Sequence, residues 1–173
     1  MNAEESKKYV LSVLVENHAG VLSRVAGLFS RRGYNIDSLT VGETHHPGRS
    51  RMTIVVTGDD NILEQITKQL GKLVEVISIQ HCKTDETVVR EMTLIKVSAP
   101  VDSRSGIIQT ANIFRARIVD VAEESLIIEA TGSQDKVGSL IKLLEPFGIL
   151  ELVRTGLTAM QRGPGILDPH CNS

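Results

Sequence analysis

Two kinds of hydrophobic pattern alternate along residues 9–80. Short apolar runs bounded by turn residues are typical of strands, and apolar residues that recur every three or four positions are typical of helices with one buried face. The apolar runs predict strands at residues 9–15, 36–41, 52–57 and 74–80. The helical spacing predicts one helix through Val21, Leu22, Val25, Leu28 and Phe29 and another through Ile62, Ile66, Leu70 and Leu73.

The order of these elements is β-α-β-β-α-β, which is typical of a ferredoxin-like domain. In such a domain the strands form an antiparallel sheet and both helices cover one of its faces. Gly33 is expected to end the first helix, where a positive φ is needed. Asp60 or Asn61 is expected to cap the second helix, because a side-chain oxygen there can accept a hydrogen bond from a free backbone N–H.

The same order of patterns repeats after a polar stretch. Strands are predicted at residues 92–97, 118–122, 126–131 and 149–153. Helices are predicted after Ser103 or Ser105 and after Ser133. We therefore predict an α+β protein with two ferredoxin-like domains, each an antiparallel sheet with helices on one face. The expected divisions are a domain at 1–82, a linker at 83–88, a second domain at 89–162 and a flexible tail at 163–173.

The composition argues against several classes of protein. Of 173 residues, 41% are hydrophobic and the formal net charge is −2, which disfavours a protein dedicated to nucleic acid or to acidic membranes. No apolar run reaches the roughly 18 residues of a membrane span, and the polar first residues do not resemble a signal peptide. The two cysteines, Cys82 and Cys171, are too few for a disulfide framework and favour a reducing cytoplasm.

The turn before the first helix is the best candidate for ligand chemistry. Free backbone N–H groups at a helix start can bind a small carboxylate, and those of Gly20, Val21 and Leu22 are suitably placed. The side-chain oxygen of Asn17 can accept a hydrogen bond from an ammonium group. Val21, Leu22 and Ile36 can line an aliphatic pocket. The alternative interpretation, that Asn17 is simply a helix cap, stays open.

Other candidate sites have simpler explanations. The segment GDDN at 58–61 differs from a thiamine diphosphate motif in its third residue and is better explained as a strand end followed by a helix cap. Adjacent histidines in a Pro-Gly loop, like the neighbouring His81 and Cys82, rarely form a closed metal site. Ser23 has no His–carboxylate pair spaced to activate it. We therefore predict neither a metal site nor a catalytic residue.

Several motifs resemble one known family. Residues 9–80 resemble an ACT domain, a small regulatory module that binds amino acids. The stretch SVLVENHAGVLSRVAGLFSRRGYNIDSLTV resembles the start of the small regulatory subunits of acetolactate synthase, also called acetohydroxyacid synthase. Further segments are also similar to this family, namely SRMTIVV at 50–56, LEQITKQLGKLVEV at 63–76, REMTLIKV at 90–97 and IFRARIVDV at 113–121. The resemblance covers about residues 8–162, and its first motif is long and specific.

The resemblance implies a function in branched-chain amino acid biosynthesis. In this family a separate large subunit condenses two 2-oxo acids with thiamine diphosphate, Mg²⁺ and often FAD. The small subunit has no catalytic site or cofactor of its own. It activates the large subunit and confers feedback inhibition, usually by valine. The resemblance thus implies a cytoplasmic homodimer that partners a large catalytic subunit and binds a branched-chain amino acid.

The resemblance also assigns the residues of the effector site. Asn17, Gly20 and Ser23 match the effector loop of the family, and Ala19 is counted with them. Asn35 and Ile36 match a facing strand start that comes from the other protomer of a dimer in this family.

An alternative function is a stand-alone tandem ACT sensor that controls another enzyme or a transcription factor. The pattern leaves open which branched-chain amino acid binds, the stoichiometry with the large subunit and the surface that contacts it. It also leaves open any role for His45, His46, Cys82 or Cys171.

Overall fold

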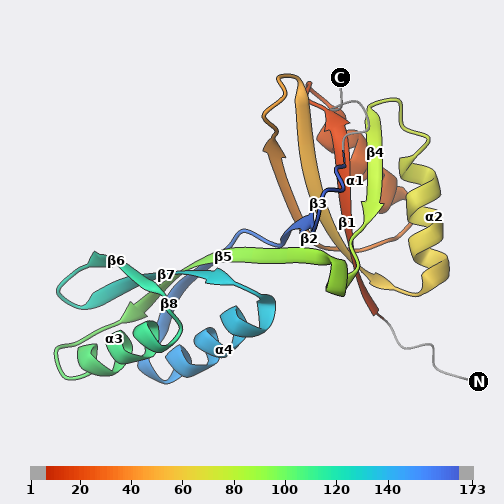
Figure 1. Cartoon of the computed structure of the whole chain (residues 1–173). Coiled ribbons are helices and arrows are strands. Elements are labelled where there is room, and N and C mark those ends of the chain that lie inside the picture. The colour runs from red at the N-terminus through yellow and green to blue at the C-terminus, as the bar shows by residue number, and fades with distance from the viewer. Residues whose placement is uncertain (1–6, 168–173) are drawn as a thin grey trace, which may run out of the picture. The chain divides into compact units, whose positions relative to one another are not determined.

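The computed structural model describes residues 7–167, which form two compact units (Figure 1). The first unit contains residues 7–88 together with 157–167, and the second is Val89–Gly156. In the described part of the chain, no helix is long and apolar enough to cross a membrane.

The first unit is a four-stranded antiparallel sheet with two helices on one face. Its elements are β1 (Lys7–Glu16), α1 (Val21–Arg31), β2 (Ile36–Glu43), β3 (Arg49–Gly58), α2 (Asp60–Leu70), β4 (Val76–His81), η1 (Thr84–Glu86) and β9 (Thr158–Gln161). The strand order is β2-β3-β1-β4, so β2 and β4 form the edges of the sheet. Val13 lies opposite both Met52 of β3 and Ile79 of β4. This register directs the alternate apolar side chains of β1 toward α1 and α2, where the core lies.

The helices of the first unit follow the predicted spacing with three corrections. One is that α2 ends at Leu70, so Leu73, expected on this helix, packs against the core from the turn that follows it. The buried face of α1 contains Val21, Val25, Leu28 and Phe29. Leu22, expected on that face, is 46% exposed because it lies about 100° around the helix from Val21. The cap of α2 is Asp59, whose Oδ1 accepts a hydrogen bond from the backbone N–H of Ile62 at 2.8 Å, and not Asp60 or Asn61. The helix begins one residue earlier than expected.

The second unit repeats this architecture. Its elements are β5 (Thr87–Ser98), α3 (Arg104–Ile113), β6 (Arg117–Val121), β7 (Ser125–Gly132), α4 (Gln134–Leu144), η2 (Glu145–Phe147) and β8 (Ile149–Arg154). The order β6-β7-β5-β8 matches that of the first sheet. Ser133 caps α4 as predicted, accepting a hydrogen bond from the backbone N–H of Lys136 at 3.3 Å. The prediction of two ferredoxin-like domains is confirmed.

One ion pair joins the central strand β5 of the second unit to its edge strand β8. The side chain of Glu91 is 2% exposed and that of Arg154 is 40% exposed. Arg154 donates from Nη2 to Oε1 of Glu91 at 2.5 Å and from Nε to Oε2 at 3.3 Å. A carboxylate buried to this degree requires such a partner, because an unpaired buried charge is costly.

The structure divides the chain differently from the expected boundaries. The expected linker at 83–88 holds η1 and the first residues of β5. Residues 157–162, expected in the second domain, belong to the first unit, as do residues 163–167 of the expected tail. The remaining residues of that tail, 168–173, lie outside the described residues. We refer to residues 157–167 as the C-terminal segment.

The C-terminal segment covers the sheet face that the helices leave free. Leu157, Ala159 and Leu167 are 4%, 4% and 8% exposed. The backbone N–H of Leu157 donates to Ser38 Oγ at 3.1 Å, and that of Arg162 donates to the Glu86 carbonyl at 2.7 Å. The free face of the sheet contains apolar side chains, so covering it removes them from water. Within this segment β9, a strand after the one expected at 149–153, pairs with β5.

Candidate functional site

The turn between β1 and α1 leaves the amino end of the helix uncapped. Gly20 occupies the N-cap position with a φ of 91°, and no side chain caps the helix there. Such a φ favours glycine, and a Cβ added at Gly20 would meet nothing within 4 Å. Asn17 is therefore not the cap of α1, and open space adjoins the backbone where the helix begins.

The same turn is held by backbone and side-chain contacts. The backbone N–H of Asn17 donates to the Gly48 carbonyl at 2.8 Å, which ties the turn to the loop between β2 and β3. His18 Nε2 lies 3.1 Å from Glu16 Oε2, with both side chains about half exposed. The backbone N–H of Arg24 donates to the Gly20 carbonyl at 3.0 Å, closing the first helical turn. The position of Gly20 is thus set by neighbours on both sides.

An ion pair beside the turn was not predicted from the sequence. Arg24 Nη1 lies 2.5 Å from Glu75 Oε1, and Glu75 is 8% exposed. The Glu75 carbonyl accepts a hydrogen bond from the backbone N–H of Glu16 at 2.9 Å, which places Glu75 next to the end of β1. Among the described residues, Glu75 Oε2 has no hydrogen-bond partner. The sequence feature that could have indicated this ion pair is an acidic residue between Val74 and Val76, in an otherwise apolar stretch.

The side chains of the predicted effector loop point in different directions. Val21 is 4% exposed and packs in the core, so its side chain does not line an open pocket. Its backbone N–H donates to the His18 carbonyl at 3.4 Å, so it is not one of the free N–H groups expected at the start of the helix. Leu22 is half exposed, and Ala19 and Ser23 are exposed. Leu22 is therefore the aliphatic side chain of this loop that a ligand could contact.

The other predicted part of the effector site, Asn35 and Ile36, lies at the far end of α1. Eleven residues of helix, about 16 Å in length, separate Gly20 from the segment that begins β2. The strand pairing agrees, since Glu16 lies opposite Arg49 at one end of β3 and Ile36 lies opposite Val56 near the other. One chain does not bring Asn17 and Asn35 together.

Asn35 and Ile36 have local roles within the chain. Asn35 Nδ2 donates to Asp37 Oδ1 at 2.9 Å, and Ile36 packs against the core as the first residue of β2. Because β2 is an edge strand, its outer side has no neighbour in the sheet.

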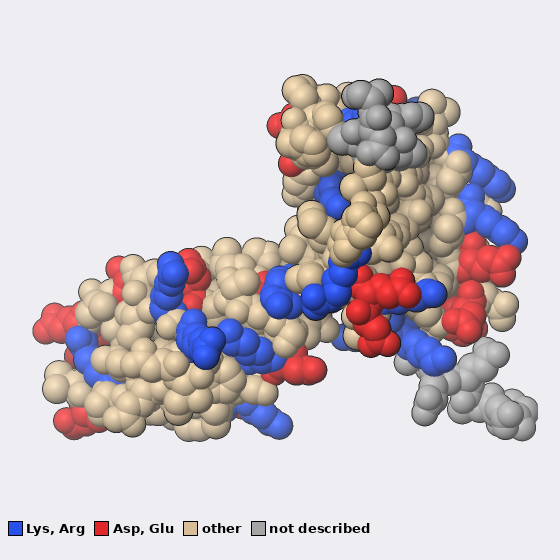
Figure 2. All heavy atoms as spheres, in the orientation of Figure 1, with Lys and Arg blue, Asp and Glu red and all other residues tan. Residues whose placement is uncertain are grey.

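Within the described residues and on the face seen in Figure 2, neither a cluster of metal ligands nor a strong surface charge marks another site. The described residues contain no group of three or more His, Cys, Asp or Glu side chains that could hold a metal ion. The rings of His45 and His46 lie against each other with centroids 4.1 Å apart. On the face seen in Figure 2, Lys and Arg are interspersed with Asp and Glu on both units. This face offers no continuous basic surface for a polyanion.

Comparison with known proteins gives consistent results for both units. Residues 11–78 match the family model described as AHAS small subunit-like ACT domain, and residues 90–163 match the model described as small subunit of acetolactate synthase.

Relatives from archaea and bacteria match along nearly the whole chain. A probable acetolactate synthase small subunit of Methanothermobacter thermautotrophicus is 54% identical over 92% of this chain and 95% of its own length. One from Archaeoglobus fulgidus is 56% identical over 90% of this chain and 98% of its own. The crystal structure of the acetolactate synthase small subunit from Thermotoga maritima has a TM-score of 0.86 at 45% identity, covering 92% of this chain and 99% of that one.

Proposed function

Because the chain belongs to the family of acetolactate synthase small subunits, we propose that it is a regulatory subunit without a catalytic site. In this proposal it binds a large catalytic subunit in the cytoplasm, raises its activity and makes it sensitive to a branched-chain amino acid, with valine as the first choice. Thiamine diphosphate, Mg²⁺ and, in many family members, FAD belong to the large subunit. The small subunit contributes binding and conformational coupling.

The observation that carries this proposal is the uncapped amino end of α1 at Gly20. The helix dipole favours a carboxylate at this position, and so do the backbone N–H groups of the first turn other than that of Val21, which donates to the His18 carbonyl. The open space beside Gly20 lets a ligand approach the backbone. An amino acid bound here would place its carboxylate on the N–H groups and its ammonium group near the Asn17 side-chain oxygen, with Ala19 and Ser23 beside it.

A second copy of the chain would complete the site. In a twofold dimer formed along β2, Asn35 and Ile36 of one copy can face Asn17 and Leu22 of the other, which one chain alone cannot achieve. Pairing two edge strands in this way also satisfies their open backbone groups. An effector held between two copies can shift their geometry, and a coupling of about 1–3 kcal/mol is enough to change the activity of a partner several-fold.

The effector site is tested by replacing Asn17. We expect Asn17→Ala to weaken valine binding about tenfold or more, because a hydrogen bond to a charged group is lost. Isothermal titration calorimetry with valine measures the effect. Asn112→Ala is a matched control, since Asn112 is also exposed but lies on α3 of the second unit. Equal valine affinity in wild type and Asn17→Ala would remove the proposed site.

The regulatory role is tested with the large subunit. Acetolactate formation by the large subunit is expected to rise when the chain is added and to fall again as valine is titrated. With Asn17→Ala, the activation should remain and the inhibition by valine should be lost. Failure to co-purify with or activate any large subunit would favour the stand-alone sensor, and acetolactate formation by the pure chain would contradict a non-catalytic role.

A further inference from the structure

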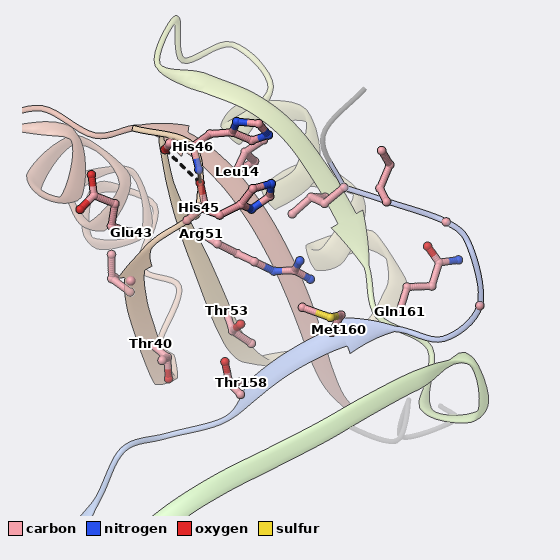
Figure 3. Close-up of a pocket in the computed structure, with 17 residues that line it drawn as sticks. Leu14, Thr40, Glu43, His45, His46, Arg51, Thr53, Thr158, Met160 and Gln161 are labelled. Atoms are coloured by element: carbon pink, nitrogen blue, oxygen red, sulfur yellow. Dashed lines mark hydrogen bonds between the residues drawn. The ribbon is translucent and has the colours of Figure 1, made fainter. Parts of the chain in front are cut away.

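A cleft of about 620 Å³ lies on the first unit, away from the turn that precedes α1 (Figure 3). One wall is the C-terminal segment, from Thr158 to Leu167, and the other is the end of β2 with the loop at 44–46. The floor is the free face of the sheet, where Arg51 and Thr53 of β3 lie. A volume of this size is typical of small-molecule sites.

Arg51 places a positive charge in this cleft. Its Nη2 donates to the Ala159 carbonyl at 2.8 Å and to Ser12 Oγ at 3.1 Å. Among the described residues, no carboxylate forms an ion pair with Arg51, and no acceptor is bonded to its Nε or Nη1. Figure 3 shows the guanidinium between the loop and the C-terminal segment, with the Glu43 carboxylate turned away from it. A half-buried cation without a counter-charge attracts an anion.

Burial affects this guanidinium without neutralising it. Desolvation lowers the pKa of Arg51 below its ordinary value, and the nearby Cys82 acts in the opposite direction. An arginine remains charged in proteins at neutral pH. The cost of keeping this charge away from water therefore falls when an anion pairs with it.

The rest of the cleft suits an apolar body carrying that anion. Thr53 and Thr158, which carry hydroxyl groups, also line the cleft (Figure 3). The rim carries Val41, Met160 and Ile166, which are 43%, 62% and 53% exposed. Exposed apolar side chains around a concave surface are typical of a ligand site.

We propose that this cleft binds a small organic carboxylate, with its anion on Arg51 and its aliphatic body against Met160 and Ile166. Glu43 is the acidic residue among the described residues that line the cleft, and its carboxylate is turned away from Arg51. An ammonium group would lose water here without gaining a negative partner, so a simple or 2-oxo carboxylic acid is preferred over an amino acid. This site does not involve the turn at Gly20 and is independent of the effector site proposed above.

The test uses isovalerate, a branched carboxylate without an ammonium group, and the full-length chain. Calorimetry or chemical-shift titration is expected to show saturable binding of isovalerate, with binding weakened about tenfold or more for its uncharged amide, isovaleramide. Inorganic phosphate separates a general anion site from the proposed one, because phosphate offers no aliphatic body. Tighter binding of phosphate than of isovalerate would overturn the assignment.

Two variants locate the binding. Arg51→Met is expected to weaken isovalerate binding about tenfold or more, because the charge-assisted hydrogen bonds are lost. Since Arg51 also holds Ala159, Met160→Asp gives a second readout that leaves this anchor in place and puts a negative charge at the rim. Leu150→Asp is the matched control, because Leu150 is 60% exposed but lies in the second unit.

Each result of these isovalerate titrations either supports or overturns binding in the cleft. Loss of isovalerate binding in Met160→Asp, with binding retained in Leu150→Asp and Asn17→Ala, supports the cleft as the binding site. Absence of isovalerate binding to wild type, or full binding to a folded Met160→Asp, overturns it. Arg51-dependent capture of the large subunit without any isovalerate binding would also overturn it, because the cleft would then hold an acidic protein segment.

Discussion

Ending the chain after Gly156 is expected to lower the free energy of unfolding of the first unit by about 4 kcal/mol. The truncation removes Leu157 and Leu167, each largely buried, and burying a leucine side chain contributes about 1.5–3 kcal/mol. It also uncovers Leu14 and Val55, which are 3% and 1% exposed in the full chain and lie on the free sheet face. Urea denaturation measures the difference.

The chain offers a direct probe for this experiment. It has no tryptophan and two tyrosines, Tyr9 and Tyr34, both in the first unit, so tyrosine fluorescence reports on that unit. The matched control ends the chain after Leu167 and keeps every described contact of the C-terminal segment. We expect the control to unfold within about 0.5 kcal/mol of the full chain. Equal stability of the chain ending at Gly156 would show that the segment contributes nothing to the first unit.

Arg154→Met is expected to lower the stability of the second unit by about 3 kcal/mol, because it leaves the buried carboxylate of Glu91 without its partner. The expected value lies at the low end of the range for buried pairs, since Arg154 is 40% exposed and partly screened by water. Far-UV circular dichroism during urea denaturation follows the loss of the second unit. Tyrosine fluorescence should report an unchanged first unit in the same samples.

Two further variants separate the loss of a partner from the loss of packing. The double variant Glu91→Met/Arg154→Met removes both charges and should recover most of the stability, because an apolar replacement of a buried pair is often close to neutral. Lys96→Met breaks the more exposed pair between Lys96 Nζ and Glu151 Oε2, 3.6 Å apart, and should cost about 0.5 kcal/mol or less. A double variant as unstable as Arg154→Met would argue that packing by Arg154, and not its charge, carries the effect.

The two proposed ligand sites use different parts of the first unit. The effector site depends on the backbone at Gly20 and is completed by a second chain, whereas the cleft depends on the Arg51 side chain and is closed by the C-terminal segment of the same chain. This difference makes them separable, since Asn17→Ala should affect valine binding alone and Met160→Asp should affect isovalerate binding alone.

Local patterns were sufficient to predict most of the secondary structure. Hydrophobic periodicity reflects which face of a helix or strand is buried, so it located both βαββαβ repeats and the fold class. Side-chain capping is also local, and Ser133 was predicted correctly. The cap of α2 was misplaced by one residue because neighbouring Asp and Asn residues have nearly equal preference for that position. The long motif around Asn17 was specific enough to indicate the family.

Tertiary structure alone decided the remaining features, because they depend on residues far apart in the chain. The strand Thr158–Gln161 is too short to show a period, and its carbonyl at Ala159 is held by Arg51, 108 positions away. Nothing near Arg51 in the sequence shows that this side chain lies in a cleft closed by the C-terminal segment. The separation of Asn17 from Asn35 likewise became visible only when α1 was placed between them. The sequence by itself determined the elements, the fold class and the family, whereas folding decided which distant side chains meet, because such contacts depend on the packing of whole sheets and not on neighbouring residues.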